Sequence, residues 1–295
     1  MKAVAGIIDL HMHTNTSDGT DTPDALIPRV RDAGIGLFSV TDHDSFGGCV
    51  RIAGILSDSD PDFLTGIEFS CRDGLGKYHI LGYGFDTGSE AFCRVVEKGR
   101  RQRLNKVGER ISFLDKAFGF TFPKEELDAL YAVECPGKPH IGNLMVKYGY
   151  ADSKEEAMEK YINRLHMPDE HVDPREAIEG ILGGGGIPVL AHPAYGDGDQ
   201  LILGAEMEER VKRLKRYGLQ GLEAYYSGFT PKIRDQMTVL ADRFGMFVTA
   251  GSDYHGSNKL VRLGDTGLAD CEILPDGLAR FLDAAGEKMI HGVRR

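Results

Sequence analysis

The chain has 295 residues, of which 41% are hydrophobic, and its 45 acidic and 35 basic residues give a net charge of −10. This composition predicts a globular protein with a buried core, and the negative charge opposes binding to duplex nucleic acid, whose phosphates attract cations. Five scattered cysteines without a Cys-x-x-Cys pair indicate reduced thiols in the cytoplasm rather than a disulfide framework. Neither the first residues nor any later segment predicts a signal peptide or a membrane span.

The first predicted strand covers residues 7–13 and carries two histidines at its carboxyl end. Because side chains alternate along a strand, Asp9, His11 and His13 would lie on one face. Two imidazoles and a carboxylate suit a divalent transition metal, and Asp18 in the following loop adds an oxygen ligand. A His-x-His pair also occurs in solvated segments, so the remainder of the chain decides between these interpretations.

The next elements predict alternating helices and strands. Thr22 and Pro23 are typical of a helix start, and this helix ends at Asp32 before Gly34. An apolar strand at 37–41 then leads to Asp42, His43 and Asp44. The pattern continues with a helix at 47–56, a strand at 63–69 with Glu68 at its carboxyl end, and a strand at 78–85 with His79 near its start.

From about residue 90 to residue 172 the pattern is helical and charged, which indicates a helical insertion in the α/β domain. Ser153 with Glu156, and Asp173 with Glu176, have the spacing of capping boxes. The second of these begins the helix that returns the chain to the main domain.

The C-terminal part repeats the alternation of strands and helices. Its predicted strands are 187–191, 219–225 and 246–250, and its predicted helices are 206–217, 231–244 and 275–285. His192 follows the first of these strands, and Asp253 and His255 follow the last. In a closed βα barrel the carboxyl ends of the strands meet on one face, where such barrels have their active sites.

Taken singly, each of these polar residues has a structural explanation: Glu68 as a solvated charge, His192 as part of a turn, His79 as a hydrogen-bonded core histidine. Together they indicate a metal site. Asp42 and His43 are adjacent and point to opposite sides of an extended chain, so we expect His43 to be a ligand. Asp42 is then an orienting group, or less readily a ligand or proton donor.

The segments DLHMHTNTSDG, TDHD, GIEFS, AHP and GSDYHG, with the isolated His79, resemble the PHP phosphoesterases, the polymerase and histidinol phosphatase family. This resemblance implies an α/β fold, a distorted (β/α)7 barrel made by residues 1–90 and 173–295 with a helical insertion at 91–172 that caps the substrate. It also implies two or three divalent metal ions. One ion would take His11, His13, Glu68 and Asp253, a second would share Glu68 and add His79 and His192, and a third would take Asp18, His43 and His255.

The insertion is similar to that of one branch of the family, the nucleoside 3′,5′-bisphosphate phosphatases and the exonucleases that act on short oligoribonucleotides. The similar segments contain Arg100, Arg103 and His140, which the resemblance implies bind substrate phosphate. Arg100 and Arg103 are three positions apart, so on a helix they share a face, although a solvated basic face would look the same. Residues 162–174 depart from the branch, which leaves the shape of the substrate pocket open.

We therefore expect a cytoplasmic phosphoesterase that hydrolyses a small phosphorylated substrate, a nucleotide or short oligoribonucleotide, by a metal-activated hydroxide. Asp42, His255 and Arg100 are the residues expected to assist this chemistry, with manganese, iron or zinc as the metals. The alternatives are a phosphatase of the histidinol phosphatase type, an amidohydrolase, and a non-catalytic metal-binding module. No duplex nucleic acid, membrane or obligate protein partner is expected.

Overall fold

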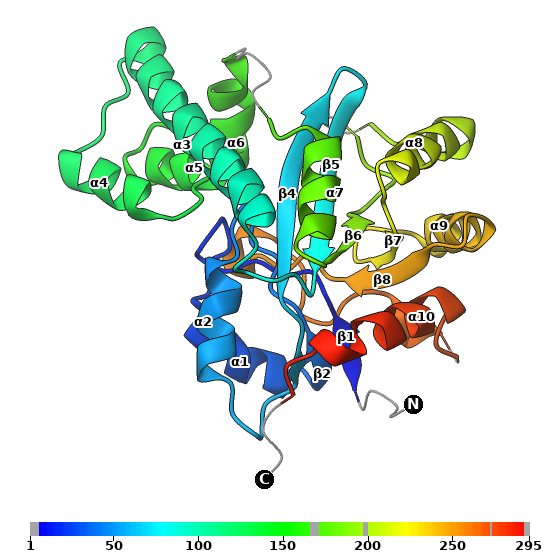
Figure 1. The fold of residues 1–295 in the computed structure, drawn as a ribbon. Helices are drawn as coiled ribbons and strands as arrows, with labels where there is room; N and C mark the ends of the chain where they lie inside the picture. Colours follow the sequence, from blue (N-terminus) through cyan, green and yellow to red (C-terminus); the bar gives the residue numbers. More distant parts are fainter. Residues whose placement is uncertain (1–5, 166–170, 197–199, 272, 292–295) are drawn as a thin grey trace.

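The computed structural model describes residues 6–165, 171–196, 200–271 and 273–291, and in this part of the chain eight strands form two sheets (Figure 1). The first sheet is parallel, in the order β1-β2-β3, and its strands are β1 (Ile7–Asp9), β2 (Ile35–Phe38) and β3 (Asp62–Phe63). Helices α1 (Pro23–Asp32) and α2 (Gly47–Ile55) connect these strands. The hydroxyl of Thr22 accepts a hydrogen bond from the amide of Ala25, as its capping role predicts.

The second sheet is mixed and has the order β4-β5-β6-β7-β8. Its strands are β4 (Gly66–Asp73), β5 (Gly76–Tyr83), β6 (Ile187–Leu190), β7 (Gly221–Tyr226) and β8 (Phe247–Gly251). The three later strands are parallel, whereas β5 runs antiparallel to both of its neighbours. Beyond β6 the helices are α8 (Gly204–Arg216), α9 (Pro231–Arg243) and α10 (Asp276–Ala285), with short 3₁₀ turns at η2 (Gly256–Asn258), η3 (Leu268–Asp270) and η4 (Gly286–Lys288).

Backbone hydrogen bonds join the two sheets at both edges. Beyond β1, the amide of Leu10 donates to the carbonyl of Ala250 and the amide of Asp253 donates to that of His11, each over 2.8 Å. At the other edge, the amide of Glu68 donates to the carbonyl of Asp42 over 3.2 Å. The fold is therefore mixed α/β, as expected, but the strands form two sheets, the second with antiparallel pairs, and the expected distorted (β/α)7 barrel is not confirmed.

The segment between β5 and β6 is helical, as its charge pattern predicts. It contains α3 (Glu90–Phe118), α4 (Lys124–Ala132), α5 (Lys138–Lys147), α6 (Lys154–Lys160), η1 (Ile162–Arg164) and α7 (Pro174–Gly183). Its middle part has its own apolar cluster, made of Val107, Leu114, Leu130, Ile141, Met145, Ala157 and Ile162. Phe92 and Val96, at the start of α3, belong instead to the main core. Helix α3 thus runs through both cores (Figure 1).

Several predicted details differ from the structure. The strand expected at 63–69 is divided into β3 and β4, because the chain leaves the first sheet after Phe63 and enters the second at Gly66. Glu68 consequently lies near the amino end of β4 rather than at a carboxyl end. The box at Asp173 and Glu176 is complete, whereas the carboxylate of Glu156 accepts from the amide of Asp152 instead of that of Ser153. Within the divergent segment 162–174, residues 166–170 lie outside the described residues.

All five cysteines are free thiols. Among the residues described above, no helix is both long and apolar enough to span a bilayer.

Candidate metal centre

The first two histidines are positioned by the segment that follows β1. Main-chain hydrogen bonds pair this segment with the end of β8, from the amide of Asp253 to the carbonyl of His11 and from the amide of His13 to the carbonyl of Tyr254, both 2.8 Å. This pairing keeps residues 10–13 extended, so that the two imidazoles project to the same side. Both side chains are completely buried.

Glu68 on β4 is the carboxylate about which the histidines gather. Five imidazoles approach its two oxygens, those of His11, His13, His43, His79 and His192. The nearest is Nδ1 of His79, 2.8 Å from Oε1, and Nδ1 of His43 lies 3.0 Å from Oε2. Burial alone would raise the pKa of Glu68, but the neighbouring histidines, His79 before the others, hold it well below its usual value.

His79 reaches this site because of the direction of β5. The residue lies near the start of its strand, as the sequence indicates, and pairs with Ser70 on β4. Since β5 is antiparallel to β4 and β6, its amino-terminal half lies beside the carboxyl ends of the parallel strands. A residue at the beginning of this strand therefore joins residues that follow the ends of the others.

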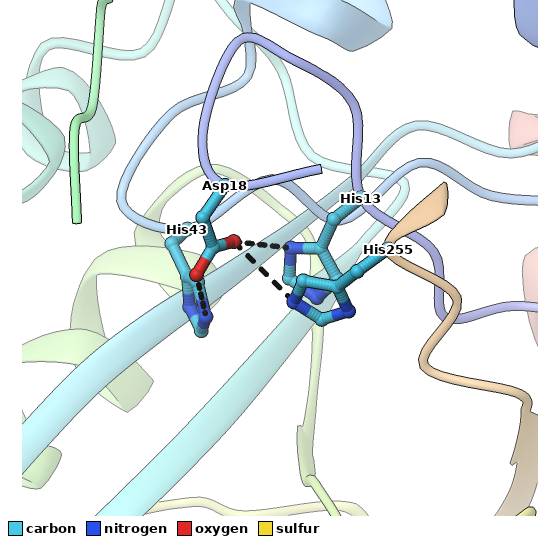
Figure 2. Close-up of side chains that lie close together, drawn as sticks. All are labelled: His13, Asp18, His43 and His255. Atoms are coloured by element: carbon cyan, nitrogen blue, oxygen red, sulfur yellow. Dashed lines mark ion pairs between the residues drawn. The ribbon is translucent and has the colours of Figure 1, made fainter. Parts of the chain in front are cut away.

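Asp18 is the centre of a second group of histidines. Figure 2 shows His13, His43 and His255 around its carboxylate, with Nε2 of His255 3.3 Å from Oδ1 and Nε2 of His43 3.8 Å from Oδ2. Nδ1 of His13 lies 3.8 Å from Oδ1. Burial would raise the pKa of Asp18, but the histidines, with His43 first, keep it well below the usual value.

Asp253 approaches His11 and His13 from the end of β8. Its Oδ1 lies 3.3 Å from Nε2 of His13 and 3.5 Å from Nε2 of His11. Its Oδ2 accepts a hydrogen bond from the hydroxyl of Tyr226 over 2.9 Å and pairs with Nζ of Lys259. The lysine and tyrosine were not singled out in the sequence, because neither belongs to a recognisable motif.

Two of the residues that follow strands have strained backbones. The φ angle is +59° at Asp253 and +26° at His192, in a region that residues with a Cβ rarely adopt. Such strain persists only where the surrounding structure enforces it, and it is concentrated at functional sites.

The unsatisfied atoms at this centre fit divalent cations. Nε2 of His11, Nε2 of His13, Nε2 of His79 and Oδ1 of Asp18 are buried and have no hydrogen-bond partner among the described residues. Buried polar atoms without partners are rare in folded proteins, so these four require a ligand. Imidazole nitrogens and carboxylate oxygens are the donors that manganese, iron and zinc accept. Three groups have their donor atoms within 4.8 Å of one another: His13, Asp18, His43 and His255; His11, His13 and Asp253; and His43, Glu68 and His79.

Glu223 on β7 is a functional residue that the sequence reasoning missed. Its side chain is fully buried, and Oε1 lies 2.8 Å from Nδ1 of His11. Its Oε2 accepts a hydrogen bond from the main-chain amide of His192 over 2.7 Å. A carboxylate behind a ligating imidazole fixes the orientation of the ring and the nitrogen that carries the proton. The available signal was a single charge within the apolar strand LQGLEAY.

Asp42 forms hydrogen bonds with the loop that follows His13. Its Oδ1 accepts hydrogen bonds from the amide of Thr14 and the hydroxyl of Ser17, and its Oδ2 accepts from the hydroxyl of Thr14, at 2.7–2.8 Å. The carboxylate therefore holds the loop that leads to Asp18, which agrees with the orienting role. Its catalytic role stays a prediction. Asp9 is turned to the amides of Ser252 and Gly264, over 2.9 and 2.8 Å, and belongs to none of the three groups above.

The predicted phosphate-binding residues of the insertion occupy different positions. Arg103 donates from Nε to Asp44 over 2.9 Å and from Nη2 to the hydroxyl of Ser70 over 2.7 Å, so it joins α3 to the rim of the metal centre. Arg100 is partly exposed, with Nη1 3.8 Å from Glu97 and a buried Nε that has no partner among the described residues. Nδ1 of His140 accepts from the amide of Gly137 at the start of α5. Burial, together with the charge of Arg103, lowers the pKa of His140, although the charge of Asp18 acts in the opposite direction.

A cavity of about 230 Å³ opens onto this centre. Its walls include the ligand-type residues His43, Glu68, His79, His192, Asp253 and His255, together with Lys77, Tyr195, Gly196, Tyr226 and Lys259. Cationic and aromatic groups thus face the clustered histidines and carboxylates, an arrangement suited to an anionic ligand with an aromatic part.

A family model described as the PHP domain matches residues 9–167. Three curated relatives show what the whole chain is similar to. It is 27% identical over 258 residues to a 3′,5′-nucleoside bisphosphate phosphatase of Chromobacterium violaceum, and the aligned region covers 85% of this chain and 88% of that protein. It is 27% identical over 268 residues to the 5′-3′ exoribonuclease Rnm of Escherichia coli, with 88% and 89% covered. It is 25% identical over 257 residues to a phosphoribosyl 1,2-cyclic phosphate 1,2-diphosphodiesterase of Eggerthella lenta, with 85% and 94% covered.

Two solved structures have a similar fold over nearly their whole length. One is an amidohydrolase from Chromobacterium violaceum with bound sulfate and no metal, which is 26% identical and has a TM-score of 0.82, covering 97% of this chain and 98% of that one. The other comes from Bifidobacterium adolescentis and is classed as a metal-dependent phosphoesterase. It is 26% identical with a TM-score of 0.77, covering 94% and 96% of the two chains.

Proposed function

The chain belongs to the PHP domain family, and on this premise we propose that it is a metal-dependent phosphoric ester hydrolase that acts on nucleotides. The observation that carries the proposal is the surroundings of Glu68, where five imidazoles converge on one buried carboxylate with Asp253 close by. Five histidines around one carboxylate exceed what a structural ion pair uses, and Nε2 of His11, His13 and His79 has no hydrogen-bond partner among the described residues, which fits bound cations.

The proposed ligands are the nine residues named from the resemblance, in the same three sets. The first set is His11, His13, Glu68 and Asp253, the second is Glu68, His79 and His192, and the third is Asp18, His43 and His255. The distances around Glu68, Asp18 and Asp253 support these sets. His13 also lies within reach of Asp18, so it can contribute to the third set as well.

Divalent metals, when bound, lower the pKa of a coordinated water and stabilise negative charge on phosphoryl oxygens. The protein contributes binding and orientation. Lys259 and Lys77 bring positive charge to the wall of the cavity and would attract the phosphate. Tyr226 and Lys259 both contact Oδ2 of Asp253, which leaves Oδ1 directed at the two histidines. Glu223 holds the ring of His11 in place from behind.

The curated relatives support a nucleotide-type substrate, because their names describe hydrolysis of phosphate esters on nucleosides, RNA and a phosphorylated ribose. In the present chain, Tyr195 and Tyr226 line the cavity, and such rings can stack on a base.

We further propose that the two sheets act as one distorted barrel, and that the insertion, roughly residues 91–172, caps the substrate. The hydrogen bonds at both edges of the sheets support the first point. Contacts of the insertion with the rim of the site support the second: Arg103 binds Asp44, and the amide of Cys135 donates to the carbonyl of Thr16 over 3.0 Å.

The test uses purified protein loaded separately with Mn²⁺, Fe²⁺ or Zn²⁺. Phosphate release is measured from p-nitrophenyl phosphate, a nucleoside 3′,5′-bisphosphate and a nucleoside monophosphate, and release of mononucleotides is measured from an RNA pentanucleotide. We expect release with at least one metal and loss of release in Glu68→Gln, which keeps the size of the side chain but removes its charge. Since one solved neighbour is named an amidohydrolase, an amide substrate is assayed in parallel. Amide cleavage without phosphate release under any metal would contradict the proposal.

A further inference from the structure

Three cationic side chains of the insertion, Lys106, Arg110 and Lys138, form a group that we call the cationic strip. Lys106 and Arg110 follow Arg103 on α3 by three and seven positions. These two side chains therefore lie on the same face of the helix as Arg103. With a rise of about 1.5 Å per residue, Arg110 lies about 10 Å along the helix from Arg103. Lys138 is the first residue of α5, which packs beside α3 (Figure 1).

The strip begins at the metal centre. Arg103 fixes the position of this face of α3 by its bonds to Asp44 and Ser70. Gly137, which precedes Lys138, lies between Arg103 and the carboxylate of Asp18: a Cβ at this glycine would be 3.4 Å from Nη1 of Arg103 and 3.6 Å from Oδ2 of Asp18. The cations therefore lead from the proposed ligand Asp18 outward along α3 and the start of α5.

These cations are half-buried, and none of them forms an ion pair with a carboxylate among the described residues. Nζ of Lys138 donates to the neutral side chain of Asn163. Burial, with the charges of Arg103 and Arg110, lowers the pKa of Lys106 to about 8. Burial and the charge of Arg110 likewise lower that of Lys138 to about 8. The three cations repel one another although the protein as a whole carries a net charge of −10. A bound anion would relieve this repulsion.

We propose that the cationic strip binds the phosphodiester backbone of a short single-stranded oligonucleotide, at the phosphates beyond the one that is hydrolysed. This inference rests on the proposed phosphoesterase function and adds a binding site outside the metal centre. A mononucleotide at the metals would not reach Arg110, about 10 Å along α3 from Arg103, whereas a chain of several nucleotides could extend along this face of the helix. Lys106, Arg110 and Lys138 would then favour oligonucleotides over substrates with a single phosphate.

The test compares wild type with the triple variant Lys106→Gln, Arg110→Gln and Lys138→Gln, each loaded with the metal that supports activity. For both proteins, kcat/KM is measured for an RNA pentanucleotide and for p-nitrophenyl phosphate over a series of salt concentrations. We expect the ratio of the two kcat/KM values to fall at least about tenfold in the variant, chiefly through KM. The slope of log kcat/KM against log salt for the pentanucleotide should become shallower by about 0.7 for each phosphate contact removed.

The matched control is Lys116→Gln, an exposed cation on the same helix outside the strip, which should leave the ratio and the salt slope unchanged. Thermal melting of all three proteins checks that the variants are folded. If the triple variant loses activity equally on both substrates, or on neither, the strip is not an oligonucleotide site. If wild type hydrolyses neither substrate with any metal, the proposed function itself fails, and this inference fails with it.

Discussion

Oε1 of Glu223 lies 2.8 Å from Nδ1 of His11, on the opposite side of the imidazole ring from Glu68 and Asp253. The carboxylate can only accept, so Nδ1 carries a proton and Nε2 is the nitrogen that faces the site and could coordinate a metal. The other oxygen of Glu223 accepts from the amide of His192. One buried side chain thereby sets both the tautomer of His11 and the start of the loop after β6.

This arrangement predicts that Glu223→Gln weakens metal binding. An amide cannot accept from both partners with its two ends, so its NH₂ group must face either the amide of His192 or Nδ1 of His11. The second choice moves the proton of His11 to Nε2, where it blocks coordination. We expect a loss of about 10- to 100-fold in metal affinity, measured by calorimetric titration of the metal-free protein. The exposed Glu209→Gln serves as control, and unchanged affinity in Glu223→Gln would show that the contact does not orient the ligand.

Two substitutions of Asp42 separate its possible roles. Asn can keep Oδ1 as acceptor for Thr14 and Ser17 and donate its NH₂ to the hydroxyl of Thr14, so Asp42→Asn preserves the loop but removes a group that could transfer a proton. Asp42→Ala leaves these donors without partners, at about 1–3 kcal/mol for each buried group. If Asp42 only orients the loop, we expect the Asp42→Asn protein to keep phosphate release and the Asp42→Ala protein to lose it. Loss of release in a folded Asp42→Asn protein would favour the proton-donor role instead.

Removal of metal should lower the melting temperature. A cation that binds only the folded state stabilises it by about 2.7 kcal/mol at one hundred times its dissociation constant, which corresponds to several degrees in a chain of this size. Differential scanning calorimetry with and without chelator measures the shift. In His13→Ala, whose Nε2 faces both Glu68 and Asp253, hydrolysis should be abolished and the metal-dependent shift should shrink. A full shift in this variant would remove His13 from the ligands.

Two glycines of α3 make a matched pair of tests for the contact between the insertion and the site. A Cβ at Gly99 would lie 2.9 Å from Oδ1 of Asp44. This oxygen accepts from the amide of Ser70, and Oδ2 of the same carboxylate accepts from Arg103. Gly99→Ala should therefore displace the helix or Asp44 and reduce both stability and kcat/KM. At Gly108 the nearest atom would be the hydroxyl of Tyr131 at 3.5 Å, so Gly108→Ala should be neutral or stabilise the helix by up to about 1 kcal/mol. Both variants are compared by urea unfolding and by kcat/KM. If Gly99→Ala and Gly108→Ala change stability and kcat/KM equally, Gly99 does not make a close contact with Asp44.

Short sequence patterns are sufficient to predict features that depend only on neighbouring residues in the chain. Helix α1 was predicted from its threonine cap, proline and terminal glycine, and His11 and His13 were predicted to share a face from strand periodicity. The direction of β5 could not be predicted, because an apolar strand reads alike in both directions, so the reason for the position of His79 emerged only from its pairing with β4. Glu223 was missed since its partners are more than thirty and two hundred residues away along the chain.

Helix α3 has a mechanical consequence. Its first turns pack in the main core through Phe92 and Val96, its middle touches the metal centre at Gly99 and Arg103, and its last turns pack in the insertion through Leu114. A swinging motion of the insertion about this connection would have to break consecutive hydrogen bonds in the middle of a 29-residue helix. We therefore expect the insertion, which we propose caps the substrate, to stay in place during turnover, so that the opening through which a substrate enters would keep its width. An opening of constant width would favour the flexible end of a short chain over the interior of a long folded RNA.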